Sequence, residues 1–320
     1  MTMRIVLCTD ANNQTVTSLV RRTLDLVDSR PDLTLVGFVT TRPGSFTTTR
    51  FSEARRWVRR VGVAAANSDA RPFRQTMTRR MRLDLFGLAR ARDIPVLVPA
   101  AGDPSDPAFV AMLVERLQPD VALSYYCYRI WRAPLLDALP QAVNYHDGRL
   151  PAYRGVGATS FPIYDGAPES GFSFHRMTYG VDEGPVLVDG AVPIADEPLG
   201  GVSRRKADAA AAALPHVLDQ IVMVGPGTPQ TGPGRYHSTR DLLACVQVPE
   251  PRELTAEELL RRLRAFGTVH ITIDGRRWPV TRVREGRHGH LTFPVADGRW
   301  LTADRVRRLP PRLGGAPLPG

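Results

Sequence analysis

The sequence has few cysteines, almost no lysine and no long apolar run. Its 320 residues include three cysteines, Cys8, Cys127 and Cys245, which lie far apart and are odd in number. This pattern excludes a disulfide framework and contains no metal-ligand spacing, so we predict a reducing compartment and no bound metal. No apolar run approaches the roughly 18 residues of a membrane-spanning helix, and no export signal precedes the first apolar segment. We therefore expect a cytoplasmic protein without a membrane partner.

The sequence also lacks a dinucleotide-binding motif. The loop after the first apolar segment, residues 10–13, reads Asp-Ala-Asn-Asn and contains no Gly-x-Gly-x-x-Gly pattern. The sequence therefore does not predict a dinucleotide cofactor. A hydrophobic content of 43% and a mean hydropathy of -0.18 are typical of a globular protein with one or two domains.

The formal net charge is +10, and Lys206 is the only lysine among 42 Lys and Arg residues. The arginines are concentrated in one region. Eleven of them lie between Thr41 and Arg82, where only Glu53 and Asp69 oppose them. Such a cluster fits either an anionic partner or a solvated face, and the sequence does not decide between the two.

The order of apolar and amphipathic segments predicts the fold class. A strand, a helix and a second strand open the chain, which indicates a doubly wound, mostly parallel Rossmann-like sheet in an α/β protein. We expect the strands and helices of this unit at residues 4–9, 16–29, 33–40, 94–98, 106–117, 120–124, 141–143, 172–177 and 185–194.

The last third of the chain has a different pattern. Residues 201–224 are mostly helical, with Pro215 predicted to mark a kink or a break, and residues 225–234 form a linker rich in Gly and Pro. A helix capped by Thr255 then precedes short alternating strands that predict a small β-barrel-like domain. We predict a catalytic domain at 1–200 with a basic insertion at 43–82, a connecting helix and linker at 201–248, and a small β domain at 249–320.

Three polar residues indicate the chemistry. Asn144 and His146 follow an apolar strand, where reactive groups collect in open α/β sheets, and residues two apart on a strand face the same way. Asp182 lies in a loop bounded by Gly180 and Gly184 after another apolar run. A carboxamide can stabilise a carbonyl oxygen that gains negative charge, while imidazole and carboxylate groups accept a proton. The set therefore suits acyl transfer to an amine without a Ser or Cys nucleophile.

This segment resembles the signature of formyltransferases that use 10-formyltetrahydrofolate. The family pattern is Asn-x-His-x-Ser-Leu-Leu-Pro-x-Tyr-Arg-Gly, then Thr-Gly-x-Thr-x-His-x-Met, then Asp-x-Gly. Gly148 and Arg149 stand where the family usually has Ser and Leu, and Ser170 and Ser173 stand where it usually has Thr. The sequence matches the pattern at Asn144, His146, Leu150, Pro151, Tyr153, Arg154, Gly155, Gly171, His175, Met177, Asp182 and Gly184.

The resemblance implies the formyltransferase fold with a small C-terminal domain of the open-barrel type that binds oligonucleotides in other proteins. It implies 10-formyltetrahydrofolate as cosubstrate, no metal, and Asn144, His146 and Asp182 as the catalytic triad. By the same likeness, the residues expected near the cosubstrate are Tyr126, Tyr128, Tyr179, Gly180 and Gly184. Those expected near the acceptor are Arg149, Arg154 and His175.

The acceptor amine is left open by the sequence. Gly148, Arg149 and the enlarged insertion favour a small biosynthetic amine, namely an amino sugar, an amino acid or a carrier-bound aminoacyl group. The barrel-like domain and the arginines suit the alternative, methionyl-tRNA, because arginine contacts to phosphate give sequence-independent affinity. Two further alternatives are a hydrolase that releases formate from the folate and a catalytically silent relative that binds folate or RNA. The sequence does not predict the oligomeric state.

Overall fold

The computed structural model describes residues 2–46, 83–195, 197–289 and 291–303. The predicted basic insertion therefore lies almost entirely outside the described residues, with the exception of residues 43–46. Among the described residues, no helix combines the length and the apolar character that a membrane span requires.

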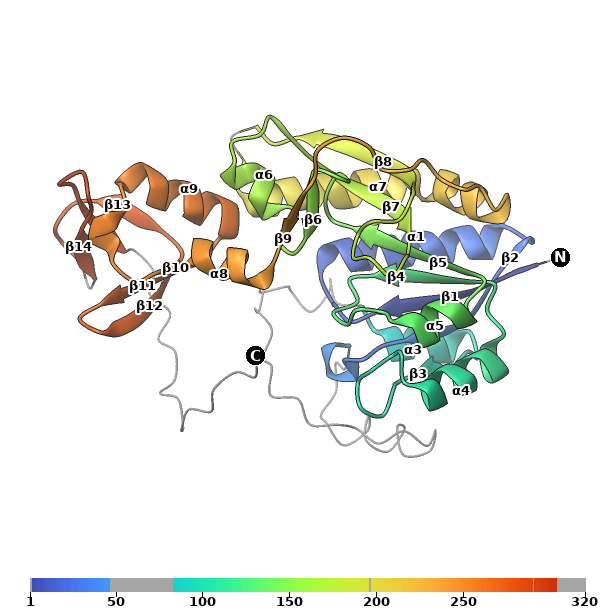
Figure 1. The fold of residues 1–320 in the computed structure, drawn as a ribbon. Coiled ribbons are helices and arrows are strands. Elements are labelled where there is room, and N and C mark those ends of the chain that lie inside the picture. Colours follow the sequence, from blue (N-terminus) through green and yellow to red (C-terminus); the bar gives the residue numbers. More distant parts are fainter. Residues whose placement is uncertain (1, 47–82, 196, 290, 304–320) are drawn as a thin grey trace.

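A seven-stranded sheet forms the centre of the larger unit (Figure 1). The strand order is β3-β2-β1-β4-β5-β7-β8. Strands β1 to β5 run parallel to one another, whereas β7 runs antiparallel to both β5 and β8. The predicted α/β class with a mostly parallel sheet is thus confirmed. The strands are β1 Met3–Thr9, β2 Leu33–Val39, β3 Val96–Leu97, β4 Val121–Tyr125, β5 Gln141–His146, β7 Glu169–Arg176 and β8 Val186–Pro193.

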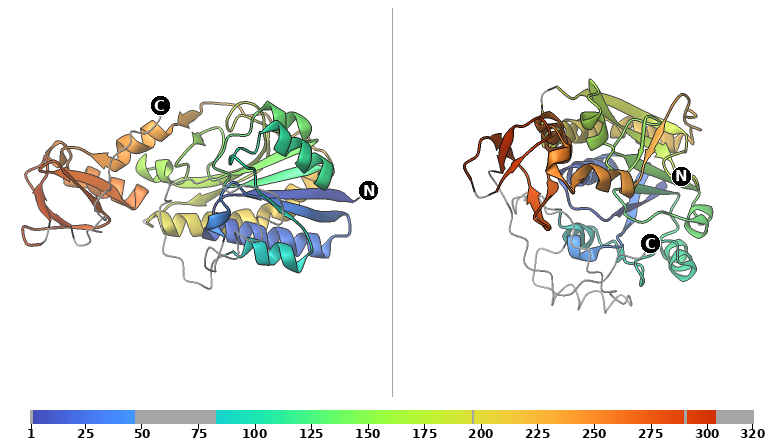
Figure 2. Two further views of the ribbon diagram at one scale, coloured as in Figure 1. Left: turned by 90° about the horizontal axis from the view of Figure 1, so that it is seen from below. Right: turned by 60° about the vertical axis from the view of Figure 1, so that its left-hand side comes forward.

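Helices cover both faces of this sheet (Figure 2). One face packs against α1, α3 and α7, whose apolar residues share a core with β1, β2, β4 and β5. The other face packs against α4 and α5. The sequence predicts a kink or a break at Pro215; helix α7 continues through this residue, so the break does not occur. The helices are α1 Gln14–Ser29, α3 Leu85–Ala91, α4 Pro107–Leu117, α5 Ala133–Ala138 and α7 Leu199–Val222.

A smaller unit follows at the other end of the chain and has its own apolar core. The hydroxyl of Thr255 accepts a hydrogen bond from the Glu258 amide at 3.2 Å, which confirms the predicted N-cap of α9. The described strands of the smaller unit form two three-stranded sheets, β10-β11-β12 and β13-β15-β14. That this unit is a barrel of the oligonucleotide-binding type stays a prediction. The elements of this unit are α8 Thr239–Val246, β10 Gln247–Val248, α9 Ala256–Phe266, β11 Val269–Ile273, β12 Arg276–Val280, β13 Val283–Glu285, β14 Thr292–Pro294 and β15 Trp300–Ala303, with a short 3-10 helix at Pro251–Glu253. A further 3-10 helix, Pro43–Ser45, follows β2 in the larger unit.

Two features join the units. Helix α6, Ser160–Tyr164, packs against the end of α9, where Phe161 and Phe266 meet edge to face with ring centroids 5.6 Å apart. A two-stranded parallel ribbon pairs β6, Tyr153–Gly155, with β9, Arg235–His237. Strand β9, which follows the linker, therefore lies directly beside β6, which follows the strand that carries Asn144 and His146.

Candidate active site

The antiparallel pairing of β5 and β7 brings two site residues together. Asn144 on β5 lies opposite His175 on β7 in the strand register. Directly opposed side chains on paired strands lie on the same face of the sheet. The side-chain nitrogen of Asn144 is accordingly 3.2 Å from Nε2 of His175. His175, predicted as an acceptor-side residue, thus contacts a residue of the predicted triad.

Backbone carbonyls orient both imidazoles. Because a carbonyl oxygen can only accept, Nδ1 of His175 donates to the oxygen of Arg176 at 2.9 Å, and Nε2 of His146 donates to the oxygen of Tyr153 at 2.6 Å. In the neutral ring the remaining nitrogen then carries a lone pair. That nitrogen is Nε2 in His175, which accepts from the Asn144 amide, and Nδ1 in His146.

Asp182 lies within 3.5 Å of one nitrogen of each imidazole. Its Oδ2 is 3.4 Å from Nδ1 of His146, and its Oδ1 is 3.5 Å from Nε2 of His175. Oδ2 also accepts a hydrogen bond from the amide of Gly155 at 2.8 Å. The carboxylate therefore faces Nδ1 of His146 directly, and a proton added between them is shared by these two acceptors.

The loop that carries Asp182 is held by a residue that the sequence analysis did not single out. Asp182 has a φ of 56°, a conformation that costs a non-glycine residue of order 1 kcal/mol or more unless its surroundings fix it. The amide nitrogen of Gln230 donates to the backbone oxygens of Asp182 and Gly184, each at 2.8 Å. Gln230 lies in the Gly/Pro-rich linker, where no periodicity marks it, so only its place in the fold reveals the contact.

Burial and charge set the ionisation of these groups. Burial raises the pKa of Asp182, but His175 and His146, which favour the carboxylate when their rings are protonated, and the Gly155 amide outweigh it and lower the pKa to about 2. Burial lowers the pKa of His146, and the opposing effect of Asp182 only partly offsets this. Near neutral pH the site therefore holds a carboxylate beside a neutral imidazole, which is a proton-accepting arrangement.

Gly148, where the resembled family usually has Ser, packs closely beside His146 and Tyr153. A Cβ at this position would lie 2.7 Å from the oxygen of Tyr153 and 2.8 Å from Nε2 of His146. The glycine therefore permits the hydrogen bond that orients the His146 ring. This gives the departure from the family pattern a local structural reason.

The residues predicted near the cosubstrate lie in two loops, one after β4 and one between β7 and β8. Tyr126 packs on Tyr145 with ring centroids 5.8 Å apart, whereas Tyr128 is half exposed, with the Arg42 guanidinium 4.3 Å from its ring centroid. Tyr179 is 69% exposed, and its hydroxyl donates to Asp137 on α5. Of the two glycines, Gly180 lies against Glu183 and Gly184 lies against the Arg176 carbonyl, where a Cβ would come within 1.8 Å. Their binding role stays a prediction.

The two arginines predicted near the acceptor are paired with carboxylates. Arg149 donates to Asp189 of β8 at 2.8 Å, and Arg154 donates to Glu183 of the site loop at 2.9 Å. Both pairs are partly exposed, so an anionic ligand could compete with either carboxylate. The arginines of the basic insertion lie outside the described residues.

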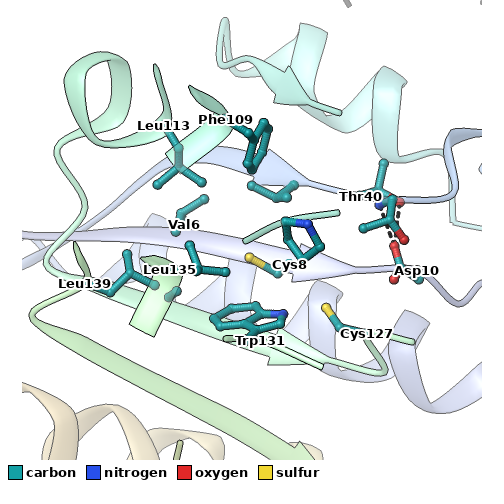
Figure 3. A pocket seen from close by; sticks show the side chains of 14 residues that line it. Val6, Cys8, Asp10, Thr40, Phe109, Leu113, Cys127, Trp131, Leu135 and Leu139 are labelled. Carbon is teal, nitrogen blue, oxygen red and sulfur yellow. Dashed lines mark hydrogen bonds between the residues drawn. The ribbon is translucent and has the colours of Figure 1, made fainter. Parts of the chain in front are cut away.

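A small apolar cavity lies elsewhere in the fold (Figure 3). It lies between strands β1, β2 and β4 on one side and helices α4 and α5 on the other. Its volume is about 10 Å³, enough for about one water molecule. Asp10 closes one end and accepts hydrogen bonds from the amides of Thr41 and Tyr128 at 2.6 and 3.0 Å. The predicted triad does not line this cavity. Among the described residues no cluster of His, Cys, Asp and Glu could hold a metal ion.

Comparison with known proteins identifies the domain. Residues 79–218 match the family model described as formyl transferase. The chain contains a formyl transferase domain. This confirms the family predicted from the motif, and the predicted triad lies inside the matched range.

Curated relatives of this formyl transferase domain differ in their acceptors. A GDP-perosamine N-formyltransferase of Brucella melitensis is 26% identical over 196 residues, which cover 60% of this chain and 74% of the relative. A methionyl-tRNA formyltransferase of Acidithiobacillus ferrooxidans is 35% identical over 136 residues, covering 42% of each protein.

A solved structure extends the likeness over nearly the whole chain. The N-formyltransferase from Helicobacter canadensis, in complex with folinic acid and dTDP-3-aminofucose, has a TM-score of 0.58 and 14% identity. The alignment covers 95% of this chain and 99% of that one. At this identity the likeness shows the fold alone.

Proposed function

We propose that the protein is an N-formyltransferase that moves the formyl group of 10-formyltetrahydrofolate to the primary amine of a nucleotide-linked amino sugar. The observation that carries the proposal is the Asp182 carboxylate held between Nδ1 of His146 and Nε2 of His175, with the Asn144 amide donating to the same His175 nitrogen. Such a cluster places a hydrogen-bond donor for a carbonyl oxygen beside a proton acceptor, as amine acylation requires.

Each residue has a distinct role in this proposal. The Asn144 amide has two donor hydrogens, and the one not directed at His175 donates to the formyl oxygen as negative charge develops there. Asp182 accepts the proton that the attacking amine loses and passes it to the leaving nitrogen. His146 shares that proton through Nδ1 while the Tyr153 carbonyl holds its ring. Bound reduced folate supplies the formyl group. The neutral side-chain amide of Asn144 is a suitable hydrogen-bond donor for its carbonyl oxygen.

The choice of an amino sugar rests on the extent of the comparisons. The GDP-perosamine enzyme matches a longer part of this chain than the methionyl-tRNA enzyme does, 60% against 42%. The structural neighbour that covers 95% of the chain holds a folate and a nucleotide-linked amino sugar. Transfer to methionyl-tRNA is the second candidate, favoured by the higher identity over the shorter match.

The test is release of tetrahydrofolate from 10-formyltetrahydrofolate, followed by absorbance with and without an amine. We expect release only when a nucleotide-linked amino sugar is present, and the donor alone to raise the melting temperature because it binds the native state. Release of formate without any amine would support the hydrolase alternative. The proposal would be overturned if saturating donor gave no turnover and no thermal shift.

A further inference from the structure

The one lysine of the chain is completely buried. Lys206 lies on α7 with 0% of its surface exposed, among 42 Lys and Arg residues of which all others are arginine. Lysine is almost never fully buried unless it is paired. The single lysine therefore lies at a position that requires a compact, buried cation.

Three acceptors surround this ammonium group. Nζ donates to the backbone oxygen of Asp147 at 2.7 Å and to the hydroxyl of Thr159 at 2.5 Å, and it lies 2.9 Å from Oδ1 of Asp147. An ammonium has three donor hydrogens, so its donor capacity is fully used. A planar guanidinium has a larger, fixed fork of donors and cannot reproduce this compact arrangement.

Asp147 is held from several elements at once. Its Oδ1 accepts from the hydroxyl of Tyr145 at 2.9 Å, and its Oδ2 accepts from the hydroxyl of Thr159. Burial raises the pKa of Asp147, but the Lys206 charge and the hydrogen bonds lower it overall. The residue directly follows His146, so the pair fixes the backbone at the end of the site strand to helix α7.

We propose that Asp147 and Lys206 form a positioning pair that fixes the backbone beside His146 and balances the electric field at its imidazole. The inference rests on the proposed function, because it assigns His146 a proton-sharing role. The charged and titratable groups that face His146 are Asp182, His175 and Asp147, with Lys206 directly behind Asp147. Since Lys206 offsets part of the Asp147 charge, Asp182 is the carboxylate with the larger effect on His146.

Removing Lys206 and removing Asp147 should shift the pKa of His146 in opposite directions. In Lys206→Met, Tyr145 and Thr159 still donate to Asp147, whose unpaired charge stabilises the His146 imidazolium and raises its pKa. In Asp147→Asn, the unpaired Lys206 lowers it. A nearby charge typically shifts a pKa by about one unit or more. The double variant replaces a buried ion pair by neutral groups, which proteins often tolerate, and should return His146 close to its starting value.

The experiment follows the imidazole of His146 by NMR through a pH titration of the free protein, with His146→Gln to assign the signal. The four forms compared are the wild type, Lys206→Met, Asp147→Asn and the double variant. Arg204→Lys, an exposed change on the same helix, is the control and should leave the titration unmoved. The acid limb of kcat against pH is measured in parallel.

We expect opposite displacements of about one pH unit in the single variants and restoration in the double variant. Displacement in the same direction, or none, would overturn the proposal, and so would lowered thermal stability as the only effect. If one single variant does not fold, the other and the double variant still give the sign. Because the NMR titration needs no acceptor, it separates failure of this inference from failure of the proposed function.

Discussion

Nδ1 of His146 lies 3.4 Å from Oδ2 of Asp182, while Nε2 of the same ring donates to the Tyr153 carbonyl at 2.6 Å. The ring is therefore held by one nitrogen and directed at the carboxylate by the other. This relationship joins the end of β5 to the loop after β7. It makes the proton-accepting capacity of the site depend on two segments that the sequence separates widely.

Asp182→Asn tests the carboxylate directly. The substitution keeps the side-chain shape but removes the charge and the proton-accepting oxygen, so we expect kcat to fall on the order of 100-fold or more. Circular dichroism should show an unchanged fold. Asp208→Asn, an exposed change on α7, is the matched control and should retain full activity. Turnover of Asp182→Asn within a few-fold of the wild type would remove Asp182 from the mechanism.

The acid dependence of kcat follows from the lowered pKa of His146. Above this pKa the ring is neutral and shares the transferred proton, and below it the ring is protonated and the capacity is lost. Activity should therefore be constant near neutral pH and decline only below the ordinary histidine value of about 6.5. A pH–rate profile at saturating substrates checks this. A decline that begins well above that value would contradict the assignment.

Gln230→Glu tests the linker contact. The carboxylate cannot donate to the Asp182 and Gly184 carbonyls and would repel them, so the loop loses both hydrogen bonds. We expect kcat to fall about tenfold, with a smaller change in melting temperature, because a slightly misplaced carboxylate costs turnover more than folding. Gln220→Glu near the end of α7 serves as the control. Equal kcat in the two variants would show that Gln230 does not position Asp182.

His237→Phe tests a buried histidine at the junction. The imidazole stacks on Phe161 with centroids 3.7 Å apart and is fully buried, and neither ring nitrogen has a partner among the described residues. Burial and then the charge of Arg235 lower its pKa. As pH falls through the unfolded value of about 6.5, the unfolded chain binds the proton first and stability declines.

The phenylalanine variant should therefore lose less stability than the wild type between neutral pH and about pH 5. Urea denaturation at several pH values measures this slope. Part of the dependence should remain, because burial also lowers the pKa of His146 and His270. An unchanged slope would show that His237 does not contribute.

The sequence predicted the sheet because it depends on local patterns, while the catalytic role of Asn144, His146 and Asp182 stays a prediction. Alternating apolar segments define β1, β2 and β4, and the Asn-x-His spacing on a strand places two side chains on one face. Gln230, Lys206 and the Gly155 amide were not predicted as contacts, because each acts across a long stretch of chain. Pro215 predicted a kink or a break, and α7 has no break there, because packing of the helix on the sheet outweighs the lost hydrogen bond.

The central claim is tested most directly by the acceptor. The purified protein is offered 10-formyltetrahydrofolate with nucleotide-linked amino sugars and, separately, with methionyl-tRNA, and the products are identified by mass spectrometry. We predict an N-formylated amino sugar, with a kcat/KM far above that for tRNA at physiological salt, and loss of this product in Asp182→Asn. Efficient formylation of methionyl-tRNA with no amino sugar accepted would contradict the account.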